Sequence, residues 1–221
     1  MSDCFRALFA GMSLQSRPRW DMLKWHWYSL EVDAMRIYGK LIALLIAAAL
    51  IAAASGSAEG IYYGSHPADD VYMTQTVAHT CTLIAATMML RNYSCQRGSP
   101  YEQVTDTGVG HFAWTKQYGL SQSFDIGQVC VRCSPEIQKV RDKKAYLIMC
   151  LQEHEEGVVI YDTGMPHAIW LFGYDEEHDT FYCADTITRN GGHAIPLEES
   201  IIRGATQQDK INTIDKIWYV K

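Results

Sequence analysis

The sequence lacks several features that would assign it to a class at once. Its 221 residues contain no internal repeat, no low-complexity tract, no glycine-rich phosphate-binding loop and no array of metal ligands. They also contain no strip of basic residues of the kind that binds nucleic acid. These absences argue against a repeat protein, a nucleotide-dependent enzyme and a metalloprotein, and we expect no cofactor and no metal.

The composition is that of an ordinary globular protein. Hydrophobic residues make up 48% of the chain and charged residues 20%, which favours one domain with appendages. The formal net charge of −6 is unevenly divided, because residues 1–58 carry six basic and four acidic residues, a net +2. Residues 59–221 carry thirteen and twenty-one, a net −8. Such an acidic domain argues against nucleic acid or an anionic membrane surface as the main partner.

One break in composition stands out, an uncharged apolar run from Leu41 to Ala54. Its fourteen residues are fewer than the roughly 20 of a bilayer span and fit the apolar core of a secretory signal peptide. Basic residues precede the run and small residues follow it, with Gly56 and Ala58 placed as a cleavage pair. We therefore predict a bacterial-style signal peptide in residues 35–58.

This interpretation makes Met35 the working start and residues 1–34 an upstream extension that is not translated. An exported protein whose N-terminus lies before Ser55 would contradict it. The alternative is an uncleaved membrane anchor with residues 1–40 inside the cell, as their positive charge favours. A buried core helix is disfavoured because the run has no polar face. Either form of export places residues 59–221 outside the cytoplasm, released or at the cell surface.

The pattern of apolar residues changes near residue 144. Before it, we expect helices at Cys81–Tyr93, from Ser99 to about Asp106, at His111–Gly119 and from Ser134. After it, short β-branched and aromatic runs predict strands at 145–151, 157–162, 168–174, 180–185, 193–197 and 216–220. The helix from Cys81, with Thr80 as its N-cap, is apolar on nearly every side and should lie at the centre of the domain. The predicted fold class is α+β, a helical part packed on an antiparallel sheet.

Two of the predicted strands flank the polar loop "DEEHD" and should pair as a hairpin. Pairing about residue 176 places His167 beside Asp185 at the open end of this hairpin. A carboxylate in that position can accept a hydrogen bond from the Nδ1–H of the imidazole and so fix the orientation of the ring. The Nε2 atom is then left to face a nucleophile.

Cys81 is the candidate nucleophile. It stands at the predicted start of a helix, where the partial positive charge of the helix N-terminus lowers the pKa of a thiol. A neighbouring imidazolium lowers this pKa further, and the thiolate can attack a carbonyl carbon. The backbone N–H of Cys81 and the side-chain amide of Gln75, six residues earlier, are candidate donors for the oxyanion.

The order Gln75–x5–Cys81, then "AATMML", "HAIWLFGYD" and "ADT", resembles the papain-like cysteine peptidases of the bacterial double-glycine leader type. These are the peptidase domains of bacteriocin exporters and their freestanding relatives. The resemblance covers residues 75–185, half of the chain. It implies a papain-like fold over 59–221, a peptide or protein substrate, Cys81 as nucleophile, His167 as base, Asp185 as orienting acid and Gln75 in the oxyanion hole.

The sequence departs from this family at three points. The residue after the cysteine is usually glycine and here is Thr82, and the residue after the acid is often proline and here is Thr186. The family's exporter domains face the cytoplasm, whereas this domain is predicted to be exported. The resemblance therefore implies an exported relative with a different substrate.

Cys130 and Cys133 form a CxxC motif, "CVRC", for which three interpretations compete. A redox pair would need a thioredoxin-like βαβ context, and a zinc site would need a second pair of ligands, and neither is present. The motif is more consistent with a structural or incidental role, in an oxidising compartment with Cys95, Cys150 or Cys183 as disulfide partners. Cys183, two residues before the candidate acid, should line the site or pack beneath it.

These features predict an exported thiol peptidase that hydrolyses peptide bonds through an acyl-enzyme. A cell-wall peptide amidase or transamidase would use the same chemistry, and the fold cannot separate these activities. From other classes, an inactive surface binding module on a peptidase fold and a thiol redox protein built on "CVRC" are the rivals. A redox protein would carry its reactivity on Cys130 and Cys133 and not on Cys81.

Overall fold

The structure is a computed structural model. It describes residues 60–117, 119–187 and 192–221. Residues 59–221 form one compact unit. The predictions for residues 1–34 and 35–58, including the apolar run 41–54, lie outside the described residues. Within the described ranges, the helices are all too short or too polar to cross a membrane.

Groups of helices and groups of strands follow one another along the described chain. The α-helices are α2 (Cys81–Gln96), α3 (Asp106–Ala113), α4 (Lys143–Glu153) and α5 (Gln207–Thr213). The 3-10 helices are η1 (Asp69–Val71), η2 (Tyr101–Gln103), η3 (Glu136–Lys139) and η4 (Leu197–Glu199). The strands are β1 (Tyr62–Gly64), β2 (Trp114–Thr115), β3 (Gly119–Leu120), β4 (Ser123–Ile126), β5 (Val129–Ser134), β6 (Val158–Asp162), β7 (His167–Asp175), β8 (Thr180–Asp185), β9 (Ile195–Pro196) and β10 (Lys216–Val220).

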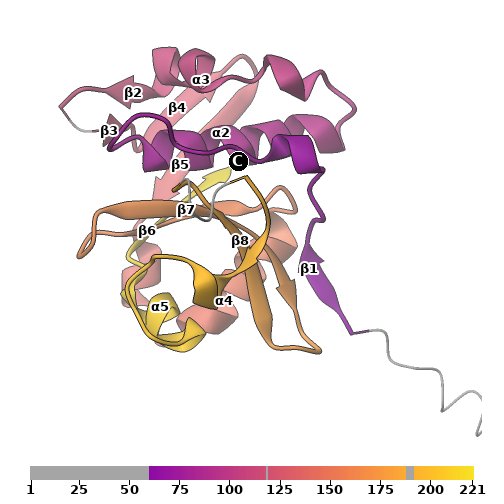
Figure 1. The fold of residues 1–221 in the computed structure, drawn as a ribbon, viewed down its shortest axis with the longest axis vertical. Coiled ribbons are helices and arrows are strands. Elements are labelled where there is room, and N and C mark those ends of the chain that lie inside the picture. Colours follow the sequence, from indigo (N-terminus) through magenta and orange to yellow (C-terminus); the bar gives the residue numbers. More distant parts are fainter. Residues whose placement is uncertain (1–59, 118, 188–191) are drawn as a thin grey trace, which may run out of the picture. The chain divides into compact units, whose positions relative to one another are not determined.

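Eight strands form one sheet in the order β4-β5-β10-β6-β7-β8-β9, with β1 paired to β7 beside this path (Figure 1). All of the pairings in this sheet are antiparallel. The long strand β7 is shared along one edge, because β6 pairs with residues 167–171 and β1 pairs with residues 173–175. The α+β class with an antiparallel sheet is therefore confirmed.

Alternate residues of β7 face two different sets of helices. Successive side chains of a strand point to opposite faces of the sheet. Ala168 and Trp170 accordingly pack in the core that contains α2 and α3, and Ile169 and Leu171 pack in the core that contains α4 and α5. All four are 0% exposed. In Figure 1, α2 and α3 lie above β7 and α4 and α5 lie below it. The sheet is thus covered on both faces, which the near-continuous apolar run of β7 requires.

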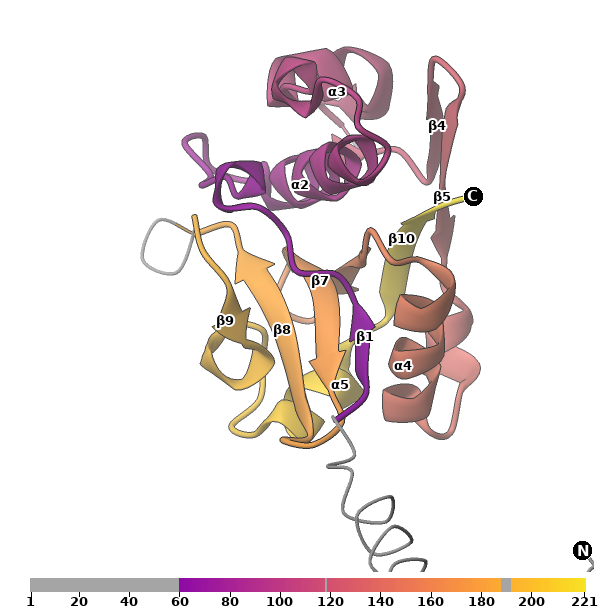
Figure 2. The same ribbon diagram turned by 90° about the vertical axis from the view of Figure 1, so that its right-hand side faces the viewer.

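The central helix α2 is buried as its composition predicts. Ala85, Ala86, Met88 and Met89 are each 0% exposed. The polar Asn92 is satisfied, because its Nδ2 donates to the carbonyl oxygen of Glu156 at 3.1 Å. Burial of a side chain the size of methionine contributes roughly 1.5–3 kcal/mol. Packing along the whole helix therefore holds its first residue in place, and Figure 2 shows this helix above the upper ends of β7 and β8.

The prediction of a strand at 145–151 is wrong, because these residues lie in α4. The side chain of Asp142 accepts a hydrogen bond from the Ala145 N–H at 3.0 Å and caps the helix. Ile148 is the one β-branched residue in the run, and leucine and methionine favour a helix. The N-cap and the helix propensity of these residues determine that the run is helical, because an apolar run this short cannot be assigned to helix or strand by its pattern alone.

The predicted division into helices before residue 144 and strands after it is also wrong. The strands β1, β4 and β5 precede this point, and α4 and α5 extend beyond it. The predicted helix at 111–119 ends at Ala113 and the chain continues into β2 and β3. The capping box at Ser99 does not form, since only a short 3-10 helix follows Pro100 and no side chain caps it. Ser134 ends β5, and a 3-10 helix replaces the helix expected there.

Candidate functional site

Cys81 is the first residue of α2, as predicted. Thr80 occupies the N-cap position, but its hydroxyl donates to the carbonyl oxygen of Val77 at 2.7 Å and makes no cap hydrogen bond. The expectation that the Thr80 side chain caps the helix is therefore wrong. The N–H groups of the first turn receive no acceptor from Thr80, so they keep their capacity to stabilise a negative charge.

The thiol of Cys81 lies against the start of β7. Cys81 is 8% exposed. Burial raises the pKa of the thiol, but the hydrogen bond with His167, the charge of His167 and the backbone N–H groups of Ala168 and Thr82 outweigh it. Together they hold the pKa of Cys81 below its ordinary value. The thiolate is thus favoured, and the thiolate is the nucleophilic form.

His167 and Asp185 form a buried hydrogen bond of 2.9 Å between Nε2 and Oδ1. Burial lowers the pKa of His167, but the hydrogen bonds with Asp185 and Cys81 raise it to about 9. Burial raises the pKa of Asp185, but the hydrogen bond with His167, the charge of His167 and the backbone N–H groups of Ile201 and Ile187 together hold it below its ordinary value. The pKa shifts of Cys81, His167 and Asp185 all favour the same charge state, in which the three groups are a thiolate, an imidazolium and a carboxylate.

The register of the hairpin differs from the predicted one. Asp185 is directly opposite Ile169, and His167 is opposite Asp162 of β6. His167 and Asp185 therefore meet diagonally, and the ring reaches the carboxylate with its far nitrogen, Nε2. The expectation that Nδ1 binds the carboxylate is wrong. Nδ1 is the nitrogen that remains to face Cys81.

Backbone N–H groups from two loops hold the carboxylate of Asp185. Its Oδ2 accepts from the Ile201 N–H at 2.9 Å, and its Oδ1 also accepts from the Ile187 N–H at 3.2 Å. These bonds keep the carboxylate ionised and fix its rotamer, because charge-assisted hydrogen bonds are short and strong. The candidate acid is thus oriented by backbone groups of two segments that follow its strand in the chain.

A buried lysine supports one of these two loops. Lys210, from α5, is 4% exposed and donates to the carbonyl oxygens of Ser200 and Ile202, each at 2.7 Å. It thereby holds the segment that presents the Ile201 N–H to Asp185. The sequence did not point to Lys210, because α5 was not predicted and a lone lysine is exposed in most proteins. The one signal was the capping box at Thr206 and Asp209, which marks the start of α5.

Gln75 is held beside the candidate acid by Thr186. The Gln75 N–H donates to the carbonyl oxygen of Thr186 at 2.6 Å, and the Thr186 hydroxyl donates to the Gln75 Oε1 at 3.3 Å. Thr186 is 0% exposed. Since Oε1 receives the hydroxyl, Nε2 is the end of the amide that is left to donate elsewhere. The structure thus joins Gln75 to Asp185 and His167 through Thr186, which is one of the departures from the family pattern.

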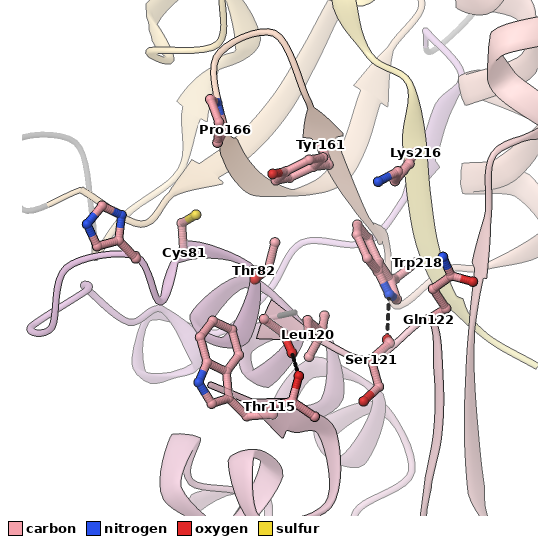
Figure 3. Close-up of a pocket in the computed structure, with 13 residues that line it drawn as sticks. Cys81, Thr82, Thr115, Leu120, Ser121, Gln122, Tyr161, Pro166, Lys216 and Trp218 are labelled. Carbon is pink, nitrogen blue, oxygen red and sulfur yellow. Dashed lines mark hydrogen bonds between the residues drawn. The ribbon is translucent and has the colours of Figure 1, made fainter. Parts of the chain in front are cut away.

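A cavity of about 620 Å³ opens beside Cys81 (Figure 3). Its walls include three aromatic side chains, Trp114, Tyr161 and Trp218, and the side chain of Lys216. The volume lies in the range of small-ligand and side-chain pockets. Of the four predicted site residues, Cys81 alone lines the cavity, and the other three lie outside its lining.

The six cysteines of the described residues are all free thiols. Cys130 and Cys133 lie in β5, three residues apart, so they face opposite sides of the strand. Their Cα atoms are then about 10 Å apart, beyond the roughly 7 Å that a disulfide spans. A redox pair would have to disrupt β5. Cys183 is 0% exposed and packs in the core beneath the site, one of the two positions expected for it.

No group of three or more histidine, cysteine, aspartate or glutamate residues in the described part of the chain is placed to hold a metal ion.

Comparisons of the chain with models of protein families, with curated proteins and with solved structures found no match.

Proposed function

We propose that residues 59–221 form an exported papain-like cysteine peptidase domain that hydrolyses peptide bonds. The observation that carries the proposal is a series of three buried side chains, each hydrogen-bonded to the next. Cys81 stands at the start of α2 and is hydrogen-bonded to His167, whose Nε2 lies 2.9 Å from Asp185 Oδ1. A nucleophile, a base and an orienting acid in this order are the parts of thiol-dependent acyl transfer.

In the proposed reaction, the Cys81 thiolate attacks the carbonyl carbon of a peptide bond. The carbonyl π electrons move to the oxygen, which the N–H of Cys81 and the Nε2 of Gln75 stabilise. The imidazolium of His167 then gives its Nδ1 proton to the leaving amine as the C–N bond breaks and a thioester forms. His167, now neutral, takes a proton from water, which attacks the thioester and regenerates the Cys81 thiolate and the imidazolium.

Asp185 serves as the orienting acid throughout this cycle. Its carboxylate accepts a hydrogen bond from the Nε2–H group and so keeps Nδ1 directed at Cys81. The departure at Thr82 leaves the backbone N–H of the helix start in place, because the side chain does not alter it. The departure at Thr186 supplies a hydroxyl for Gln75 that a proline would lack. Neither departure removes a group that the reaction needs.

The first experiment measures thiol reactivity in the full chain. Iodoacetamide would be applied at several values between about pH 4 and pH 9, and the modified cysteines would be identified by mass spectrometry. We expect Cys81 to react well below pH 7, and the variant His167→Ala to react only near the free-thiol pKa of about 8.5. The double variant Cys130→Ser/Cys133→Ser is the matched control and should keep the wild-type profile.

The proposal fails if Cys81 reacts only near about pH 8.5, or if Cys130 and Cys133 react before it. The second of these results would favour a thiol redox protein. If Cys81 is activated, a proteome-derived peptide mixture would be incubated with wild type and with Cys81→Ala. New peptide termini that need Cys81 support the peptidase. An activated Cys81 that cleaves only cell-wall peptides supports the amidase, and transfer to an added amine supports the transamidase.

A further inference from the structure

The cavity beside Cys81 carries positive charge in an otherwise acidic domain. Residues 59–221 contain thirteen basic and twenty-one acidic residues, a net charge of −8. The lining of the cavity nevertheless contains no aspartate or glutamate, and its basic side chains are Lys216 and His79. In a pocket whose charged groups have one sign and whose walls are apolar, the electrostatic field of those groups is concentrated inside the pocket and attracts a ligand of opposite charge. The lining therefore favours an anionic group.

Lys216 faces the cavity because of its place in β10. It lies directly opposite Tyr161 in the sheet and two residues before Trp218, so all three side chains point to the α2 face. Figure 3 shows the three around the cavity, with Cys81 on the same cavity. The Lys216 Nζ lies 5.5 Å from the centroid of the Tyr161 ring. Among the described residues it forms no ion pair, so its charge is not neutralised by a neighbouring carboxylate of the fold.

The remaining walls suit apolar groups of a peptide. Trp114, Tyr161 and Trp218 line the cavity, and the Trp218 Nε1 donates to the carbonyl oxygen of Ser121 at 3.0 Å. This bond joins the sheet to the segment after β3 and fixes one wall. Aromatic walls offer apolar contact area, and a single charged group among them orients a ligand.

The position of the base indicates which side of the scissile bond enters the cavity. His167 must lie on the leaving-group side, since it protonates the departing amine. The cavity reaches Cys81 but is not lined by His167, Asp185 or Gln75. Pro166, the residue before His167, does line it. Because His167 itself lies outside the lining, the amine that it protonates also lies outside the cavity, and the acyl part of the substrate is the part that can enter it.

We propose that this cavity binds the acyl side of a peptide substrate that carries an acidic side chain, with Lys216 paired to its carboxylate and the aromatic walls around its apolar neighbours. The inference rests on the proposed function, because it needs Cys81 to be the nucleophile. It goes beyond that function by assigning the class of substrate and the residue that selects it.

The test uses irreversible peptidyl acyloxymethyl ketones, which occupy only the acyl side and alkylate the nucleophile. N-acetylated tripeptide probes would differ only in glutamate against glutamine, placed in turn at each position. The second-order rate of Cys81 labelling would be measured for each pair with the full chain. At one or more positions we expect the glutamate probe to react about tenfold faster, the effect of roughly 1.4 kcal/mol, with the preference falling at high salt.

Three variants assign the preference to Lys216. Lys216→Met should equalise the rates of the two probes, and Lys216→Glu should favour a probe with lysine in place of glutamate. Lys139→Met is the matched control, because it removes the same charge from an exposed site outside the cavity, and it should keep the wild-type ratio. The wild-type ratio and its dependence on salt do not depend on how any variant folds.

Labelling with iodoacetamide separates the two ways in which the inference can fail. If iodoacetamide modifies Cys81 at acidic pH but the probe pairs react equally at every position, the proposed function stands and the assignment to Lys216 is overturned. A glutamate preference that survives in Lys216→Met overturns it as well. If iodoacetamide shows no activated Cys81, the proposed function fails and the inference fails with it.

Discussion

His167 and Asp185 meet diagonally across β7 and β8, with the imidazole Nε2 2.9 Å from the carboxylate Oδ1. Asp185 is directly opposite Ile169, so the ring spans two positions of the ladder to reach it. This offset decides which nitrogen is free, because the near nitrogen, Nδ1, is left beside the backbone of β7. The Ala168 N–H of that same backbone also stabilises the Cys81 thiolate.

Removing the charge of Asp185 should shift the reactivity of Cys81 to higher pH. In Asp185→Asn the pKa of His167 falls, and the pKa of Cys81 rises because the imidazolium is less populated. We expect the midpoint of iodoacetamide labelling to rise by about one to two pH units, which lowers the rate at pH 6 by about 10- to 100-fold. Asp179→Asn, at the other end of the hairpin, is the matched control. An unchanged profile in Asp185→Asn would refute the orienting role.

Stability should depend on pH through His167. Its pKa is raised to about 9 in the folded protein, above the value of about 6.5 expected when unfolded. The imidazolium therefore stabilises the fold fully below about pH 6.5, and this stabilisation is lost as the pH rises towards about 9. The effect is best isolated in Cys81→Ser, where the thiol beside His167 no longer titrates and Asp185 remains as the group that raises the pKa of His167.

In that background, the destabilisation caused by His167→Gln should be larger at pH 6 than at pH 9.5, by about 1 to 2 kcal/mol. Urea unfolding at the two pH values would give the four free energies. A destabilisation that is equal at the two pH values would show that folding does not raise the pKa of His167.

Thr186 should act as a positioning residue for Gln75. Thr186→Val keeps the shape but removes the hydroxyl that donates to Gln75 Oε1 at 3.3 Å. We expect kcat for a cleaved peptide to fall about tenfold with little change in KM, since removing an oxyanion donor outright costs about 10²- to 10³-fold. Thr186→Ser should restore most of the activity.

A double-mutant comparison tests whether Thr186 affects kcat through Gln75. In the background of Gln75→Ala, Thr186→Val should have no further effect on kcat, because the residue that it positions is absent. An additive loss in the double variant would mean that Thr186 acts through the fold and not through the glutamine.

Lys210→Met should destabilise the domain. The substitution leaves two buried carbonyl oxygens, those of Ser200 and Ile202, without the donor that they share. We expect the free energy of unfolding to fall by about 2 to 4 kcal/mol, measured by urea denaturation. The exposed Lys139→Met should stay within about 0.5 kcal/mol of wild type. Equal stability of the two variants would contradict a structural role for the buried ammonium.

Local patterns in the sequence were sufficient for some elements and not for others. The helix from Cys81 and the strands around Tyr161, Trp170, Phe181 and Trp218 were predicted because long apolar runs and alternating β-branched residues specify them locally. The run at 145–151 was assigned wrongly, because a short apolar segment suits either state and the cap at Asp142 decided it. The strands β4 and β5 were missed although they pair with each other locally, because the strand that joins β5 to the rest of the sheet, β10, lies at the far end of the chain.

The sequence by itself determined the residue types of the candidate site, since Cys81, His167 and Asp185 stand at element ends whose patterns are local, and Gln75 lies in the irregular segment before α2. Only the tertiary structure decided how they meet. The diagonal register, the choice of Nε2 for Asp185, the link from Thr186 to Gln75 and the buried Lys210 all join segments far apart in the chain. Such contacts depend on strand register and on packing between layers, and local periodicity does not encode them.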